Sequence, residues 1–92
     1  MKLYGYEIPQ HVIDGAACFM RREPFTSAML VGVIDRLLPA DAKPANRLAS
    51  RGDIAYRGAD RIVQRERKAG RLVSDSKLRG IQFWRWVDKE AA

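Results

Sequence analysis

Apolar residues recur at helical intervals in the first half of the chain and predict two helices there. The clearest stripe, with spacing i, i+3, i+4, i+7 and i+8, consists of Met29, Leu30, Val33, Ile34, Leu37 and Leu38. It predicts a helix over residues 27–38. An earlier apolar pattern predicts a helix over residues 9–22, and Pro9 suits its first turn. The Glu23-Pro24 pair ends that helix, because the residue before a proline avoids the α region.

A third helix is expected over residues 54–69, and Gly70 is the expected glycine at its C-terminal end. Wound at 100° per residue, this segment has an apolar side interrupted only by Glu66 and an opposite side rich in basic residues. The apolar side carries Ala55, Ala59, Ile62, Val63 and Ala69, and the basic side carries Arg57, Arg61, Gln64, Arg65 and Lys68. A long amphipathic helix with a basic front favours contact with a polyanion over an ordinary solvated surface.

The start of this third helix depends on residues 39–53, whose Pro, Ala, Asp and Asn content is typical of a loop. A short helical piece is expected within it, from Pro44 to near residue 52. Asp53 is then the expected N-terminal cap of the third helix. Gly58 would cost about 1 kcal/mol relative to alanine and could delay the regular helix to Arg57.

After Gly70 the periodicity changes from helical to alternating, which predicts a β-hairpin over residues 71–87. Its strands are expected at about 71–74 and 81–87, with a polar turn between them. Phe25 and Thr26 could form a further, very short strand. The second hairpin strand carries aromatic residues on both faces, so the pattern leaves open which face is inward.

The same strand contains Trp84 and Trp86, which are expected in the core more often than as stacking platforms for nucleobases. An exposed aromatic strand could instead form the edge of a homodimer. Together the elements predict one α+β domain over residues 1–92, mainly α with a C-terminal β-hairpin. Residues 1–8 are expected to dock as an N-terminal arm, and residues 88–92 to form a tail.

Ninety-two residues allow one small domain with a single hydrophobic core. No apolar run approaches the roughly 18 residues that span a bilayer, and the N-terminus lacks the pattern of a signal peptide. The single cysteine, Cys18, excludes an internal disulfide and fits a reducing compartment. A cytoplasmic location is therefore expected.

The chain lacks the residue patterns of common catalytic and cofactor sites. His11 and Cys18 are the only histidine and cysteine, and two helical turns place them roughly 10 Å apart, too far for a nucleophile–base pair. We expect a surface histidine and a buried thiol. No Cys/His spacing suits zinc, and no glycine-rich phosphate loop is present. We therefore expect that the protein is not an enzyme and that it has no metal, cofactor or small-molecule substrate.

The net charge of +6 is concentrated in one half of the chain. Residues 1–42 carry −1, residues 43–85 carry +8 and residues 86–92 carry −1. A basic face of this kind indicates a polyanionic partner, with nucleic acid first and an anionic membrane surface second.

Three helices, a very short strand between the first two and a hairpin directly after the third resemble a winged helix-turn-helix DNA-binding domain. The most specific segment is RIVQRERKAGRLV, residues 61–73, in which a basic amphipathic helix closes on Ala-Gly and passes into a strand. The resemblance covers residues 9–87. The connection over residues 39–53 is longer than the short turn usual in that family.

This resemblance implies that the third helix inserts in the major groove of double-stranded DNA with its N-terminal half at the base edges. The implied base-reading residues are Tyr56, Arg57, Asp60, Arg61 and Gln64. Arginine can bond to guanine in a bidentate manner, and glutamine to adenine. The implied phosphate contacts are Arg47, Arg51, Arg65, Lys68, Lys77 and Arg79. Lys77 and Arg79 are expected at the hairpin tip, and six to eight neutralised phosphates would give a salt slope of about −5 to −7.

A stand-alone module of this size suggests a small transcriptional regulator, of phage or mobile-element origin. Two other classes of function remain open. The same fold could serve as a protein–protein interaction module without nucleic-acid binding. RNA binding has less support, because no aromatic RNA-binding signature is present.

Overall fold

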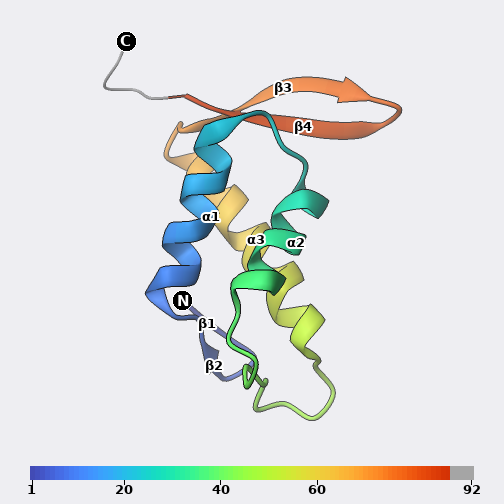
Figure 1. The fold of residues 1–92 in the computed structure, drawn as a ribbon. Coiled ribbons are helices and arrows are strands. Elements are labelled where there is room, and N and C mark those ends of the chain that lie inside the picture. The colour runs from blue at the N-terminus through green and yellow to red at the C-terminus, as the bar shows by residue number, and fades with distance from the viewer. Residues whose placement is uncertain (88–92) are drawn as a thin grey trace.

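The computed structural model describes residues 1–87, which form three helices and two antiparallel hairpins (Figure 1). The elements in chain order are β1 (Lys2–Leu3), β2 (Tyr6–Glu7), α1 (Gln10–Arg22), α2 (Ser27–Leu37), α3 (Arg51–Lys68), β3 (Leu72–Leu78) and β4 (Ile81–Trp86). This order confirms a mainly helical α+β domain that ends in a β-hairpin. The predicted tail, residues 88–92, lies outside the described residues.

Helices α1 and α2 match their predicted spans to within one residue at each end. α1 follows Pro9, and its backbone turns extended again at Glu23, immediately before Pro24. α2 begins after Thr26, whose hydroxyl oxygen accepts a hydrogen bond from the Met29 amide at 3.1 Å. This contact satisfies one of the amides left without a partner at the start of a helix.

The core lies between the three helices, and α3 passes behind α1 and α2 (Figure 1). Its largest fully buried side chains are Phe25, Met20, Leu30, Ile34, Ile54, Ile62 and Val12. Each helix thus contributes most of the apolar face that its periodicity predicts. The exception in the α2 stripe is Met29, which is 40% exposed.

The N-terminal arm is a small hairpin, formed by β1 and β2. Tyr4 and Gly5 make its two-residue turn with φ values of 53° and 78°, as in the turns that suit the twist of tight hairpins. Leu3 and Ile8 are buried. A Cβ added at Gly58 would lie 3.3 Å from a terminal carbon of Ile8, so the glycine in the middle of α3 allows the close approach of this arm.

The start of α3 differs from the prediction, which placed the cap at Asp53 and the regular helix as late as Arg57. Ser50 is the cap: its hydroxyl accepts from the Asp53 amide, and the Asp53 carboxylate accepts from the Ser50 amide at 2.7 Å. This reciprocal capping box lets the helix begin at Arg51. The expected helical piece from Pro44 to near residue 52 does not form; residues 38–50 are turns and irregular backbone.

The first strand of the C-terminal hairpin is longer than predicted: β3 continues to Leu78, through most of the expected polar turn. The turn itself is only Arg79-Gly80, with φ values of 51° and 81°, which again suits a two-residue hairpin turn. The pairing register shifts between Ser74 and Ser76, so that Asp75 forms a bulge. Figure 1 shows the hairpin lying across one end of the three helices.

The short strand expected at Phe25-Thr26 is a single bridge between Phe25 and Trp84 of β4. Trp84 and Trp86 are partly buried and pack against the core, as expected for these residues. The inward face of β4 is therefore the one that carries the tryptophans, which the alternation alone left open.

The two residues with catalytic potential in α1 are both on the surface. His11 is exposed, as expected. Cys18 is also exposed, so the expectation of a buried thiol is wrong. The buried positions of α1 are Val12, Ala16 and Met20, and Cys18 lies off the stripe that these residues form.

Candidate nucleic-acid interface on helix α3

The interface candidate is the outward face of α3, an 18-residue helix that is about 27 Å long at 1.5 Å per residue. Its inward face carries Ile54, Ala55, Gly58, Ala59, Ile62, Val63 and Glu66, all of which are buried. The residues predicted to read bases, Tyr56, Arg57, Asp60, Arg61 and Gln64, are all exposed. The helical periodicity thus placed these five side chains on the solvent side correctly.

Two grooves flank this outward face of α3. One is lined by Asp60, Arg61, Gln64, Arg65, Lys68 and Met1. The other, with a volume of about 680 Å³, lies between the end of α3 and the hairpin and is lined by Gln64, Arg67, Lys68, Leu72, Val73, Ser74, Gln82 and Trp84. Both grooves are open to solvent; three of the six lining residues of the first and two of the eight lining residues of the second are cationic. Gln64 and Lys68 line both of them and therefore occupy the ridge between the two grooves.

Of the residues predicted to contact phosphates, Arg65 and Lys68 are exposed on α3. The Arg65 guanidinium lies 3.4 Å from a carboxylate oxygen of Glu66, and its side chain remains half exposed. Lys68 is in the last turn of the helix. Both cations are available at the surface beside Gln64.

Arg51 has a different role from the one predicted. Its guanidinium donates to the backbone carbonyls of Leu38 and Asp35, at 2.9 and 2.7 Å, and also to that of Pro39. Its Nε lies 3.3 Å from the Asp35 carboxylate. The Arg51 side chain therefore satisfies carbonyls at the C-terminal end of α2 and holds α2 to the start of α3. We exclude Arg51 from the candidate interface.

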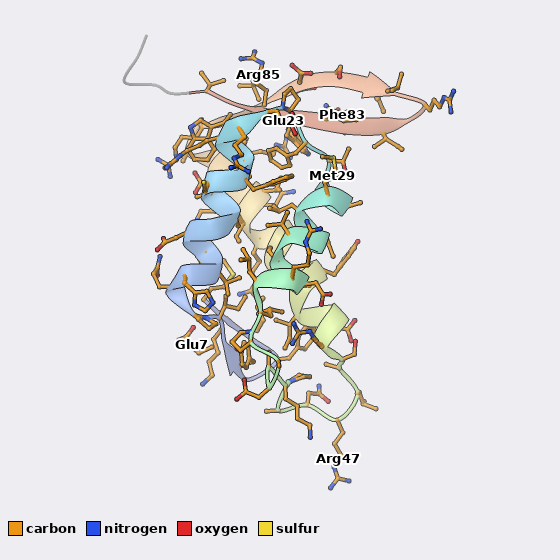
Figure 2. The ribbon with its side chains drawn as sticks, viewed as in Figure 1. Glu7, Glu23, Met29, Arg47, Phe83 and Arg85 are labelled. Carbon is orange, nitrogen blue, oxygen red and sulfur yellow. The ribbon has the colours of Figure 1, made fainter. Side chains whose placement is uncertain are left out.

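The remaining predicted cations lie at the two ends of the molecule. Arg47 is exposed on the loop before α3, and Figure 2 shows its side chain extending outward from that loop. Arg79 is at the hairpin tip, as predicted. Lys77 is not at the tip: it pairs with Gln82 inside the hairpin, because β3 extends to Leu78.

At the junction between α3 and β3, backbone hydrogen bonds around Gly70 cap the C-terminal end of the helix. Gly70, with φ 78°, allows its own amide to bond to the Arg67 carbonyl, and the Arg71 amide to bond to the Glu66 carbonyl, each at 2.9 Å. Gly70 therefore has the predicted role. The chain turns sharply here, and the hairpin follows α3 without a linker.

An ion pair between a buried carboxylate and a half-exposed arginine holds the same junction. Glu66, which interrupts the apolar side of α3, is only 6% exposed and pairs with Arg71. A hydrogen bond from Arg71 to this carboxylate, together with its negative charge, raises the pKa of Arg71. The carboxylate is thereby compensated where the helix passes into the hairpin.

Three arginines lie against the tryptophans of β4, a contact that the sequence pattern did not reveal. The Arg67 guanidinium carbon is 4.7 Å from the ring centroid of Trp84, and those of Arg21 and Arg71 are 5.0 and 6.0 Å from that of Trp86. These are cation–π distances. A solvated basic residue and one stacked on an aromatic ring look the same in a one-dimensional pattern, so only the tertiary contact distinguishes Arg67 from Lys68.

Within residues 1–87, no helix is both long and apolar enough to cross a membrane. In the same part of the chain, no group of three or more His, Cys, Asp or Glu side chains is arranged to hold a metal ion. The candidate site on the described surface is the cationic face of α3.

No family model matches the chain, and comparisons with curated proteins and with solved structures likewise find no match.

Proposed function

We propose that this chain is a winged helix-turn-helix domain that binds double-stranded DNA. The order of three helices and a C-terminal hairpin supports this assignment. The bridge between Phe25 and Trp84 adds to it, because the segment between α1 and α2 then pairs with the second hairpin strand. The hairpin would be the wing, and a transcriptional regulator is the role that we propose for so small a module.

In the proposed complex α3 enters the major groove. Arg57 and Arg61 would donate to guanine, and Asp60 could accept from the amino group of cytosine. Arg65 and Lys68, further along α3, would bond to phosphates, as would Arg47 on the loop before α3 and Lys77 and Arg79 of the hairpin.

The observation that carries this proposal is the composition of the exposed face of α3. From Arg57 to Lys68 its exposed charged residues are Arg57, Asp60, Arg61, Arg65, Arg67 and Lys68. Five of these six are cations, and the only exposed carboxylate is that of Asp60. The opposite side of the helix packs in the core, so this cationic face is held rigidly outward.

A fluorescence anisotropy titration with duplex DNA at several salt concentrations tests the proposal. We expect the protein to bind duplex DNA with an affinity that falls steeply with salt. The double variant Arg57→Ala/Arg61→Ala should lose this binding. The matched control is Arg22→Ala/Arg36→Ala, which removes the same charge from exposed positions on α1 and α2. The control should bind nearly as tightly as the unmodified protein. Absence of duplex binding at low salt, or equal losses in both variants, would contradict the proposal.

A protein-binding role is the second candidate, and the hairpin tip favours it. Leu78 and Ile81, which face each other beside the turn, are 62% and 54% exposed. Large exposed apolar side chains are frequent at protein interaction sites. A homodimer formed through this strand would place them in its interface, and light scattering after size exclusion would detect it. Tight binding of a protein partner that tolerates salt would favour this second candidate.

A further inference from the structure

The indole of Trp84 offers a fixed surface next to the C-terminal end of α3. Its backbone amide and carbonyl both bond to Phe25, with N···O distances of 2.8 and 3.0 Å. Phe25 is fully buried, and the Trp84 side chain packs against the core. The ring is therefore held in place by the fold and not by solvent-exposed contacts alone.

Arg67 of α3 lies on this surface and at the same time contacts Gln64. Its guanidinium carbon is 4.7 Å from the centroid of the Trp84 ring, and its Nη1 donates to the Gln64 side-chain oxygen at 3.3 Å. The two residues are three apart on the helix, a spacing that lets their side chains meet. Among the described residues, no carboxylate competes for Arg67.

In this contact the Gln64 amide has its oxygen turned toward Arg67. A glutamine side chain carries an oxygen acceptor and an NH₂ donor on opposite sides of a planar group. Because the oxygen side is turned toward Arg67, the NH₂ side is turned away from it. Gln64 is exposed on the ridge between the two grooves, so a partner that meets this ridge encounters hydrogen-bond donors.

We infer that Arg67 is a positioning residue that makes Gln64 select a guanine; this inference rests on the proposed DNA-binding function. Guanine presents two neighbouring acceptors, N7 and O6, in the major groove, which match an NH₂ group. Adenine presents one acceptor and one donor, and its bidentate recognition by glutamine needs the amide oxygen. A guanine contact therefore replaces the adenine contact that the resemblance to winged-helix domains implies for Gln64.

The test compares the base preference of variants at a single position of the DNA site. Selection from a randomised duplex pool identifies the site, and Gln64→Ala identifies the base pair whose discrimination depends on Gln64. Duplexes with each of the four bases at that position are then titrated with the unmodified protein, Arg67→Ala and Lys68→Ala. Lys68 is the matched control, because it is an adjacent exposed cation that does not bond to Gln64.

The unmodified protein should favour guanine over adenine by about tenfold, within the range of one good bidentate contact. Arg67→Ala should shift the preference toward adenine, whereas Lys68→Ala should weaken all four duplexes equally. A preference for adenine in the unmodified protein would overturn the inference. So would an equal weakening of all four duplexes by Arg67→Ala, which would mark Arg67 as a phosphate contact only.

A second measurement separates this inference from the proposed function, because it needs no DNA. The side-chain NH₂ signals of Gln64 in a ¹⁵N correlation spectrum should move in Arg67→Ala and stay in place in Lys68→Ala. Unmoved signals in Arg67→Ala would overturn the pairing even if the protein binds DNA. Shifted signals in a protein that binds no duplex would leave the pairing intact and refute the proposed function, and with it the guanine preference.

Discussion

Phe25 and Trp84 are joined by two backbone hydrogen bonds that tie the segment between α1 and α2 to the hairpin. Phe25 belongs to the buried core and Trp84 packs against this core. The Phe25 ring also lies edge-on to Phe19, with ring centroids 6.0 Å apart. This pair fixes the position of the hairpin relative to the helices together with the capped C-terminal end of α3 at Gly70 and the Glu66–Arg71 ion pair. The geometry of the candidate interface depends on it.

Truncation of Phe25 should destabilise the fold strongly. Because this side chain is 0% exposed, Phe25→Ala should lower the free energy of unfolding by about 3–5 kcal/mol. The milder Phe25→Leu, which leaves a smaller cavity, should lower it by about 1–3 kcal/mol. Urea denaturation followed by tryptophan fluorescence measures both. Phe83→Ala is the control on the other face of β4, and a loss there as large as that of Phe25→Ala would contradict the prediction.

The buried carboxylate of Glu66 should make Arg71 important for stability. Arg71→Ala removes the main partner of this carboxylate and should lower the midpoint of thermal denaturation, because Glu66 is buried and would keep its charge without its closest counter-charge. The double variant Glu66→Leu/Arg71→Ala removes the stranded charge and should regain most of this loss. Thermal denaturation of the two variants is the measurement, and an equal loss in both would argue against this role of the pair.

Arg71 should contribute no pH dependence to stability near neutrality. Glu66 raises the pKa of Arg71, and a raised pKa in the folded state adds stability that is present below the unfolded pKa and is lost only as pH rises through the folded one. The unfolded pKa of arginine already lies far above the neutral range. The stability difference between the unmodified protein and Arg71→Leu/Glu66→Leu should therefore show no titration step from Arg71 between about pH 6 and 9, as measured by urea denaturation at each pH.

Alanine at two helical glycines, Gly32 and Gly15, should have different effects on stability. A Cβ at Gly32 of α2 would have no atom within 4 Å, so Gly32→Ala should raise the free energy of unfolding by about 0.5–1 kcal/mol through helix propensity. A Cβ at Gly15 of α1 would lie 2.5 Å from a terminal carbon of Leu37. Gly15→Ala should therefore be destabilising or at best neutral, since Leu37 must move. A thermal denaturation series resolves the two signs, and a stabilising Gly15→Ala would refute the packing described for this site.

Substitution of Arg51 should affect mainly stability, and substitution of Lys68 should affect mainly DNA binding. Arg51→Ala removes hydrogen bonds to the end of α2 and should lower the free energy of unfolding by about 1–2 kcal/mol, with little change in the salt dependence of binding. Lys68→Ala should leave stability nearly unchanged and reduce the salt slope by about 1. With Arg51 excluded, five predicted phosphate contacts remain, and the full slope should be about −4 to −5. The reverse assignment of the two effects would show that Arg51 contacts the DNA.

Local pattern was sufficient to predict several parts of this fold. The stripe from Met29 to Leu38 predicted α2, and the opposed faces of residues 54–69 predicted which side of α3 is buried. These inferences succeed because helical periodicity depends only on neighbouring residues and on the preference of apolar side chains for the core. Gly70 was identifiable for the same reason. The residue after a helix often adopts a left-handed conformation, which favours glycine, and this preference is local.

Other features required the tertiary structure. Gly58 looked unfavourable for a helix, yet it lies buried within α3 because the N-terminal hairpin packs closely against it. Cys18 was expected in the core, but it is exposed because α1 packs in the core through Val12, Ala16 and Met20, and Cys18 lies off the stripe that they form. The start of α3 depended on whether Ser50 and Asp53 form reciprocal hydrogen bonds, which the residue types allow but do not require.

For the interface, the sequence by itself determined which residues of α3 face outward and that they are mostly cationic. It could not determine what each cation is already bonded to. Arg51, Arg67 and Arg71 carry the same guanidinium, yet one holds the end of α2, one lies on Trp84 and one compensates Glu66. These assignments depend on contacts that the fold creates, several of them between residues distant in the chain. Only the three-dimensional arrangement therefore decides them.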